Sequence, residues 1–290
     1  MISPSLVKNI EVAGLDVALI EQRVAGALAE DAHGGDLTSK ATISADHISK
    51  AHFTSRKSGV VAGTLVAAAV LEQCGVTNYE IVKKDGSSVS AGEVIIEVEG
   101  NTRAILLAER TALNFLSHLS GIATITSLWV KEVLGTSTQV RDTRKTTPGL
   151  RELEKYAVRM GGGTNHRMTL TDGALIKDNH IAAAGGVVEA FAKVRALYPD
   201  SEIEIEVDTL DQLREVLPQK PDLVLLDNMS PAQCAEAVAI VNGACKLEAS
   251  GGISIENARA YAESGVDYIA IGALTHSAPV FDTGLDLRAE

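Results

Sequence analysis

The sequence predicts an α/β protein in which a compact N-terminal α+β module precedes a (β/α) barrel. Two observations carry this prediction. Between residues 50 and 98 the apolar residues recur with a short period and glycine turns are dense. From about residue 138, short strand-like runs alternate with helical patterns, which is typical of βαβ units and a parallel sheet. A chain of 290 residues is long enough for a barrel with a smaller partner domain.

Composition excludes several classes of protein. The formal net charge is −12 and aromatic residues make up only 3%, so the basic surface and stacking rings of a nucleic-acid-binding protein are both missing. The N-terminus shows no signal-peptide pattern, and the longest apolar run, residues 59–71, is too short to span a bilayer. The three cysteines form no CxxC pair, as in a reducing compartment; they are Cys74, Cys234 and Cys245. The sequence therefore predicts a cytoplasmic protein.

The first half of the chain predicts helices around a small sheet. Residues 15–29 and 64–74 have apolar positions at helical spacing. Residues 51–63 have the pattern of paired strands, and residues 79–100 that of two strands around an Asp85-Gly86 turn.

A long helix is expected over residues 102–135, which are rich in Leu and Ala. Glu109 and Arg110 interrupt an otherwise apolar stretch of it, so we expect Arg110 to lie in a buried region and to need a partner. Its spacing alone favours neither a functional role nor a structural ion pair.

The second half predicts six strands separated by helices. The strand-like runs are TQVRD, ALIKDN, EIEIEVD, DLVLLDN, CKLEAS and DYIAIG, between residues 138 and 272. Helical patterns cover 150–160, 187–197, 210–216, 231–241 and 255–264. An open doubly wound sheet is the alternative to a barrel, but no GxGxxG follows a strand, so its dinucleotide-binding form lacks the expected motif.

Polar or small residues follow nearly every one of these strands. In a parallel barrel the carboxyl ends of the strands converge on one mouth, where such enzymes carry their chemistry. The sequence thus predicts an active site formed by Arg141-Asp142, Lys177-Asp178-Asn179, Glu206, Asp227-Asn228, residues 248–250 and Gly272.

The barrel interior is predicted to be polar and ion-paired. Glu202, Glu204 and Glu206 alternate with apolar residues, so all three share one face of their strand, and residues 246, 248 and 250 repeat the pattern. The apolar face packs against helices, which leaves the glutamates to point inward. Buried charge requires compensation, and the candidate partners are Arg141, Lys177 and Lys246.

Cations and acids at the mouth indicate an anionic ligand and a metal. Arg144, Lys145, His166, Arg167 and Lys177 suit a ligand with several negative groups, because Arg binds carboxylate or phosphate in a bidentate manner and Lys as a point charge. Glu206 and Asp227, on adjacent strands, suit Mg²⁺, which takes a few carboxylate oxygens and keeps phosphate and water as its other ligands.

Two glycine segments favour a phosphate site. Ser250-Gly251-Gly252 precedes a predicted helix, and Gly272-Ala273 follows the last strand. Backbone N–H groups at helix N-termini bind phosphate, and the last two loops of a barrel are the usual place for it. Ordinary strand-to-helix turns explain either segment alone. No GxxxxGK[ST] is present, which argues against a P-loop nucleotidase.

At this point the motifs resemble a known family. TRKTTPGLRELEKYAVRMGGGTNHR, LIKDNH, EVD, LLDNM, LEASGGI and IGALTHS are similar to the signature of the quinolinate phosphoribosyltransferases. EDAHGGDLT and ERTALNFLSHLSGIAT resemble the N-terminal half of the same family, so the resemblance runs from about Glu30 to the C-terminus.

The resemblance implies a function and a fold. The reaction is the Mg²⁺-dependent transfer of phosphoribosyl from phosphoribosyl pyrophosphate to quinolinate with decarboxylation, which gives nicotinate mononucleotide for NAD biosynthesis. The fold is an N-terminal α/β sandwich domain, residues 1–118, plus a C-terminal incomplete (β/α) barrel, residues 119–274. The tail, about 275–290, would rejoin the first domain, and the enzyme would be a homodimer.

The resemblance also implies roles for individual residues. Quinolinate would be held by Arg110 of the other subunit, Arg144, His166, Arg167 and Lys177. Phosphoribosyl pyrophosphate would be held by Thr143, Lys145, Glu206, Asp227, Ser250, Gly251, Gly252, Ile271, Gly272 and Ala273. The metal ligands would be Glu206 and Asp227, directly or through water, and the catalytic residues Lys145, Lys177, Glu206 and Asp227.

Three other functions are consistent with parts of the pattern. A nicotinate phosphoribosyltransferase shares the fold, but its substrate has one carboxylate fewer and requires fewer cations. A Schiff-base lyase or aldolase would use Lys145 or Lys177, whose pKa would have to be lowered. A non-catalytic anion-binding barrel would have no use for the full set of acids, cations and glycines.

Overall fold

A computed structural model describes residues 2–288 of the chain. It consists of two compact units. The first takes the chain up to Ile125, the segment Glu152–Gly162 and the chain from Ala278 onward, and the second takes Thr126–Arg151 and Gly163–Ser277. The boundary predicted at residue 118 falls inside helix α5 (Thr102–Glu132). The segment Glu152–Gly162, assigned to the barrel by the sequence, belongs to the first unit.

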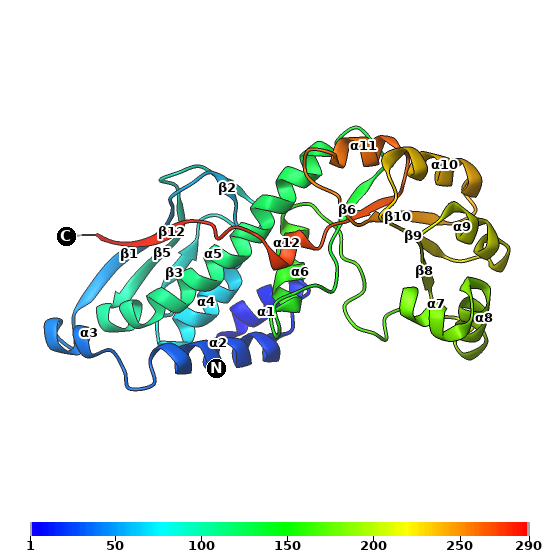
Figure 1. Ribbon diagram of the computed structural model, residues 1–290. Coiled ribbons are helices and arrows are strands. Elements are labelled where there is room, and N and C mark those ends of the chain that lie inside the picture. Colours follow the sequence, from blue (N-terminus) through cyan, green and yellow to red (C-terminus); the bar gives the residue numbers. More distant parts are fainter. Residues whose placement is uncertain (1, 289–290) are drawn as a thin grey trace. The chain divides into compact units, whose positions relative to one another are not determined.

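The first unit is built on a four-stranded antiparallel sheet. Its strand order is β12 (Thr283–Arg288), β1 (Ile48–Ser55), β5 (Val94–Asn101) and β3 (Tyr79–Ile81). The final strand therefore pairs with the first, a contact that spans most of the sequence and is visible in Figure 1.

Local strand pairing was predicted incorrectly in this unit. The segment 51–63 does not form a hairpin, because β1 pairs with β5 and β12. The short strand β2 (Gly59–Val60) pairs instead with β4 (Ser88–Val89) from the region of the Asp85-Gly86 turn. Which strands pair depends on contacts distant in sequence, and period-two patterns do not encode them.

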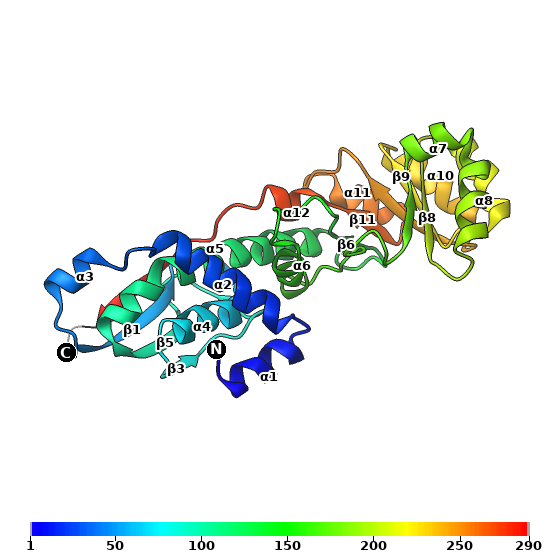
Figure 2. The same ribbon diagram turned by 90° about the horizontal axis from the view of Figure 1, so that it is seen from below.

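Helices cover one face of this sheet. They are α1 (Pro4–Val12), α2 (Val17–Asp31), α3 (Leu37–Thr42), α4 (Thr64–Gln73) and the first part of α5. In Figure 2, α2 and α4 lie in front of the strands β1 and β5. The side chains from Val66 to Leu71 in α4 are fully buried, so this helix is the centre of the unit's core.

Helix α6 (Arg151–Met160) joins the first unit through buried polar contacts. The hydroxyl of Tyr156 donates to Asp85 Oδ2 at 2.8 Å, and Asp85 Oδ1 accepts the N–H of Thr64 at 2.9 Å, which caps α4. His118 Nε2 lies 2.9 Å from the buried carboxylate of Glu154. These partners hold α6 against α4 and α5, although its sequence lies between two strands of the second unit.

Arg110 lies on α5, but its burial was predicted incorrectly. The side chain is exposed in the single chain and makes no hydrogen bond or ion pair to another residue within 2–288. Its neighbour Glu109 is half-buried, and burial raises the pKa of that carboxyl. An apolar sequence on both sides of Arg110 therefore does not enclose it, because the helix turns its apolar face away.

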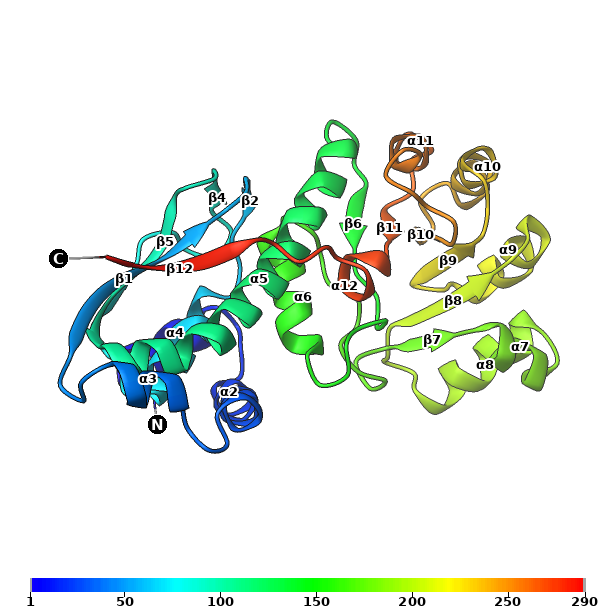
Figure 3. The same cartoon turned by 60° about the vertical axis from the view of Figure 1, so that its left-hand side comes forward.

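The second unit contains the six predicted strands as one parallel sheet. Figure 3 shows them as a curved row with helices on the outer side. The order is β6 (Gln139–Arg141), β11 (Tyr268–Ala270), β10 (Lys246–Ser250), β9 (Leu223–Asp227), β8 (Ile203–Val207) and β7 (Ala174–Ile176). The row ends at β6 and β7, which do not pair with each other. The sheet is thus an incomplete (β/α) barrel, as expected, rather than a doubly wound sheet.

The helices of the second unit follow local sequence signals closely. They are α7 (Asp178–Ala184), α8 (Val187–Leu197), α9 (Leu210–Val216), α10 (Pro231–Val241), α11 (Ala258–Glu263) and α12 (Ala273–His276). Ser230 caps α10 and Thr209 caps α9, each in a capping box with the glutamine three residues on. Among the helices of residues 2–288, none is both long and apolar enough to cross a bilayer.

Candidate active site

A cavity of about 400 Å³ lies at the carboxyl ends of the strands in the second unit. It brings together the predicted site residues Thr143, Arg144, Lys145, His166, Arg167, Lys177, Glu206, Asp227 and Ser250. Its remaining lining residues are Leu175, Leu225, Glu248 and Ala270. Residues from six strands and their following loops thus converge at one mouth, as the strand-end pattern predicted.

The acids of the cavity come from adjacent strands. Glu206 on β8 is level with Leu225 of β9, so Asp227 lies two residues further toward the mouth on the same face. Burial raises the pKa of Asp227, and the neighbouring carboxylates of Glu206 and Asp208 raise it further. A divalent cation bound beside Asp227 and Glu206 would compensate this negative charge.

The cations of the cavity are poised for an anion. Burial lowers the pKa of the Arg167 guanidinium, and the nearby charge of Arg144 lowers it further. The buried Nε of Arg144 has no hydrogen-bond partner among residues 2–288. Lys177 Nζ lies 2.8 Å from Glu206 Oε2 with half of its side chain exposed. Two crowded guanidiniums and a lysine at the rim would gain stabilisation from a ligand with two carboxylates.

Asp142 anchors the loop that carries two of these predicted ligands, and the sequence did not assign it this role. It is fully buried and accepts the backbone N–H of His166 at 2.9 Å and the side-chain amide of Asn165 at 2.5 Å. Arg167 Nη1 in turn donates to the carbonyl of Gly173 at 2.7 Å. An acid placed directly after strand β6 was the available signal, because a strand end can fix the next loop.

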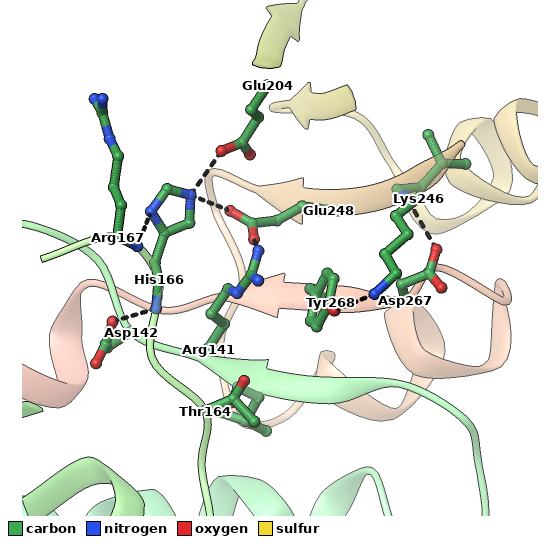
Figure 4. Close-up of polar contacts among 12 residues, drawn as sticks. Arg141, Asp142, Thr164, His166, Arg167, Glu204, Lys246, Glu248, Asp267 and Tyr268 are labelled. Carbon is green, nitrogen blue, oxygen red and sulfur yellow. Dashed lines mark hydrogen bonds and ion pairs between the residues drawn. The ribbon is translucent and has the colours of Figure 1, made fainter. Parts of the chain in front are cut away.

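Below the cavity the barrel interior is polar and ion-paired, as predicted. Arg141 Nη1 lies 2.8 Å from Glu248 Oε2, and Glu204 Oε2 lies 2.7 Å from His166 Nε2 (Figure 4). Burial raises the pKa of both Glu204 and Glu248 to about 7. His166 was expected at the ligand, not as a partner of these acids.

Two predictions about this interior were wrong. Lys246 does not bind a glutamate; its Nζ lies 2.9 Å from the Tyr268 hydroxyl on the next strand (Figure 4). Lys246 is the first residue of β10, and its side chain extends along the sheet toward β11 instead of into the barrel interior. Glu202 precedes β8 and is exposed, so only Glu204 and Glu206 of the three alternating glutamates are buried.

The glycine segments have a demonstrable structural reason. Gly251 has φ +86°, and a Cβ there would lie 2.2 Å from Asn228 Oδ1 and 3.0 Å from the Asn228 nitrogen. A Cβ at Gly272 would lie 3.1 Å from Cδ of Lys145. The helix expected directly after Ser250-Gly251-Gly252 begins later, since α11 starts only at Ala258. The backbone N–H of Ser254, which lies between them, donates to Asn257 Oδ1 at 2.8 Å.

Some predicted ligands are not brought to the cavity wall within 2–288. In the two segments predicted to bind phosphate, Ser250 is the one residue within 2–288 that lines the cavity. The remaining predicted phosphate ligands do not line it; they are Gly251, Gly252, Ile271, Gly272 and Ala273. Arg110 belongs to the first unit, and its role stays a prediction.

The second unit is an incomplete parallel barrel with cations and carboxylates at its mouth. This fold and site place the chain in the class of barrel enzymes that bind anionic ligands. Models of the two domains of quinolinate phosphoribosyl transferase match this chain, the N-terminal domain at residues 36–120 and the C-terminal domain at 122–286. The chain therefore belongs to the quinolinate phosphoribosyltransferase family.

Individual relatives agree with this assignment. The chain is 49% identical over 268 residues to the nicotinate-nucleotide pyrophosphorylase [carboxylating] of Mycobacterium leprae, covering 90% of this chain and 94% of the relative. It is 42% identical to a probable enzyme of the same name from Bacillus subtilis, with 89% and 90% covered. The nicotinate-nucleotide pyrophosphorylase structure from Francisella tularensis superposes with a TM-score of 0.91 at 39% identity, covering 94% of this chain and 98% of that one.

Proposed function

We propose that this protein transfers the phosphoribosyl group of phosphoribosyl pyrophosphate to quinolinate and decarboxylates the product, giving nicotinate mononucleotide, pyrophosphate and CO₂ for NAD biosynthesis. The observation that carries the proposal is the division of one cavity into a cationic side and an acidic side. Family membership supports it, since the relatives are described by this activity.

The cationic side suits the two carboxylates of quinolinate. Arg144 lies close enough to Arg167 for its charge to lower the pKa of the Arg167 guanidinium, and Lys177 completes the set. Guanidiniums bind carboxylates in a bidentate manner, which fixes the ring plane as well as its position. Lys145, whose side chain is exposed near Gly272, would face the diphosphate.

The acidic side suits Mg²⁺. Glu206 and Asp227 would hold the ion, directly or through water, and the effect of the Glu206 charge on the pKa of Asp227 supports this fit, because it indicates that the two side chains lie near each other. When bound, Mg²⁺ neutralises charge on a leaving pyrophosphate.

The chain's own residues would assist the departure of pyrophosphate. As the bond from the sugar's C1 to the pyrophosphate oxygen breaks, the leaving group takes the electron pair and C1 becomes positive; Lys145 would stabilise the leaving oxygens and the nearby acids the sugar. The quinolinate nitrogen then bonds to C1 and becomes a pyridinium. The bond between C2 and its carboxylate breaks, CO₂ leaves, and the electron pair left at C2 takes a proton.

Decarboxylation limits how tightly the cations bind. The 2-carboxylate loses its charge as CO₂ forms, so a strong ion pair to it would stabilise the ground state more than the transition state. A set of cations shared between two carboxylates avoids this, because the 3-carboxylate keeps its charge and anchors the ring throughout.

We also propose a homodimer in which Arg110 enters the site of the other subunit. The exposed side chain of Arg110 on α5, within a largely apolar stretch of that helix, supports a partner outside its own chain.

Comparison of quinolinate with nicotinate tests the proposed function. With phosphoribosyl pyrophosphate and Mg²⁺, we expect turnover of quinolinate with release of CO₂ and little turnover of nicotinate, because the cationic side would be left uncompensated by one carboxylate. Equal kcat/KM for the two acids would contradict the proposal. Borohydride trapping of substrate on Lys145 or Lys177 would instead support a Schiff-base enzyme.

A further inference from the structure

Both ring nitrogens of His166 are engaged inside the second unit. Nδ1 accepts the backbone N–H of Arg167 at 2.9 Å, and Nε2 lies 2.7 Å from Glu204 Oε2 (Figure 4). A nitrogen that accepts an N–H carries no proton of its own, so the ring proton must be on Nε2. His166 is therefore held as the Nε2–H tautomer, with Nε2 donating to Glu204.

A second carboxylate and an arginine hold this arrangement in place. Glu248 Oε1 lies 3.9 Å from His166 Nε2, while Glu248 Oε2 lies 2.8 Å from Arg141 Nη1. The guanidinium of Arg141 is stacked over the ring of Tyr268, 3.8 Å from its centroid. Glu204 and Glu248 are 5% and 1% exposed and stand on separate strands of the barrel. Both carboxylates are therefore shielded from water.

The cluster lies directly beneath a predicted ligand of quinolinate. Glu248, His166 and Arg167 all line the cavity, and the bond from the His166 ring fixes the backbone from which the Arg167 side chain departs. The same side chain is held at its far end by the carbonyl of Gly173. The position of the Arg167 guanidinium thus depends in part on Glu204, which does not itself line the cavity.

We propose that Glu204 and Glu248 are positioning residues for quinolinate. Glu204 holds the Nε2–H of His166, Glu248 holds Arg141 beside that ring, and the ring in turn fixes the backbone of Arg167, so that His166 acts through Arg167 rather than by binding a carboxylate with its own ring. The proposal rests on the proposed function and deepens it. It narrows the predicted set of direct quinolinate ligands in this chain to Arg144, Arg167 and Lys177.

A metal ion is the other occupant that this cluster suggests. His166, Glu204 and Glu248 each offer one possible ligand atom, and these three atoms lie within 4.8 Å of one another. The guanidinium of Arg141 already contacts Glu248, however, and a second cation would have to lie beside it. The charge of Arg141 therefore favours the hydrogen-bonded arrangement over a metal site.

The tautomer of His166 is the most direct test. We would label the histidines with ¹⁵N and identify the signals of His166 by their loss in a His166→Asn variant. The expected result is a non-protonated Nδ1 and a protonated Nε2 in the free protein, unchanged when quinolinate is added. A proton on Nδ1, or a switch of tautomer with quinolinate, would overturn the proposal. Because the free protein gives a result, this test stands even if quinolinate proves not to be the substrate.

Steady-state kinetics provide the second test. Glu204→Leu removes the acceptor, and we expect the KM for quinolinate to rise roughly 10- to 100-fold while the KM for phosphoribosyl pyrophosphate stays within about twofold. Glu204→Gln keeps an acceptor oxygen and should restore most of the affinity. Lys246→Met is the matched control, since Lys246 is also a charged barrel residue but pairs with Tyr268 away from the cavity.

The alternatives give different patterns. Equal rises in both KM values would indicate a general structural defect, and unchanged quinolinate affinity in folded Glu204→Leu would contradict the positioning role. If Glu204→Leu does not fold, the tautomer of His166 in the wild-type protein and in Glu204→Gln decides the question.

Discussion

Lys177 Nζ lies 2.8 Å from Glu206 Oε2, so a predicted carboxylate-binding cation and a predicted metal ligand are paired with each other. Lys177 follows β7 and Glu206 lies on the neighbouring β8, near the carboxyl edge of the sheet. Quinolinate and Mg²⁺ would each take one member of this pair. The ion pair would therefore keep both charges compensated before quinolinate and the metal bind.

Removal of the acid in this pair should weaken the binding of Mg²⁺. We expect Glu206→Gln to reduce kcat/KM by roughly 100-fold or more and to raise the Mg²⁺ concentration for half-maximal rate, because one of two carboxylates is lost. Glu202→Gln is the control, since Glu202 precedes the same strand but is exposed and does not line the cavity. An unchanged Mg²⁺ dependence in Glu206→Gln would rule this residue out as a metal ligand.

Shared active sites would be revealed by complementation. Arg110→Ala and Arg167→Ala chains should each be nearly inactive alone, and mixing them after reversible dissociation should restore about a quarter of the wild-type activity. This fraction follows because half of the dimers are mixed and one of their two sites is intact. If the activity of the mixture stays at the level of the single variants, Arg110 acts in the active site of its own subunit or in no active site.

Stability should depend on pH through Glu248. Burial raises its pKa from an ordinary 4.5 to about 7, with Glu204 contributing. The folded state therefore favours the protonated carboxyl, and this contribution is complete below about pH 4.5 and is lost as the pH rises through about 7. In urea unfolding, the free energy of unfolding of the wild type relative to Glu248→Gln should fall between about pH 5 and about pH 8. A difference that does not vary with pH would show that Glu248 has no raised pKa.

Gly251 should tolerate no side chain. Gly251→Ala combines a left-handed φ of +86° with a clash against Asn228. We expect the free energy of unfolding to fall by about 1–3 kcal/mol. We also expect catalytic activity to fall, because Asn228 is adjacent to Asp227 and donates a hydrogen bond to its carboxylate. Gly243→Ala is the control for strain alone, since its φ is +79° and nothing lies within 4 Å of the added Cβ. Equal effects of the two substitutions would remove Asn228 from the explanation.

Local signals in the sequence predicted much of the second unit. All six strands were identified, and the bounds of α8, α9 and α10 were predicted from the helical spacing of their apolar residues. In the structure Thr209 and Ser230 cap α9 and α10 at the predicted starts. Helix α7 was missed: it starts at Asp178, and its N-cap is Lys177, a residue type that seldom caps a helix and that the sequence assigned to a strand end.

What could not be predicted depends on contacts distant in sequence. The pairing of β1 with β12 joins segments more than 200 residues apart, and the attachment of α6 to the first unit depends on Tyr156 reaching Asp85. In the site, the acids and cations of the mouth were found because strand ends share one edge. The partner of Glu204 was not, because His166 lies on a loop whose course the anchor Asp142 determines.

The fate of the 2-carboxylate tests the central claim most directly. Quinolinate labelled with ¹⁴C in the 2-carboxylate would be incubated with the protein, phosphoribosyl pyrophosphate and Mg²⁺, in parallel with quinolinate labelled in the 3-carboxylate. We predict that the first label leaves as CO₂ in a one-to-one ratio with pyrophosphate, whereas the second stays in nicotinate mononucleotide. Pyrophosphate release without labelled CO₂, or no release of either, would contradict the proposed reaction.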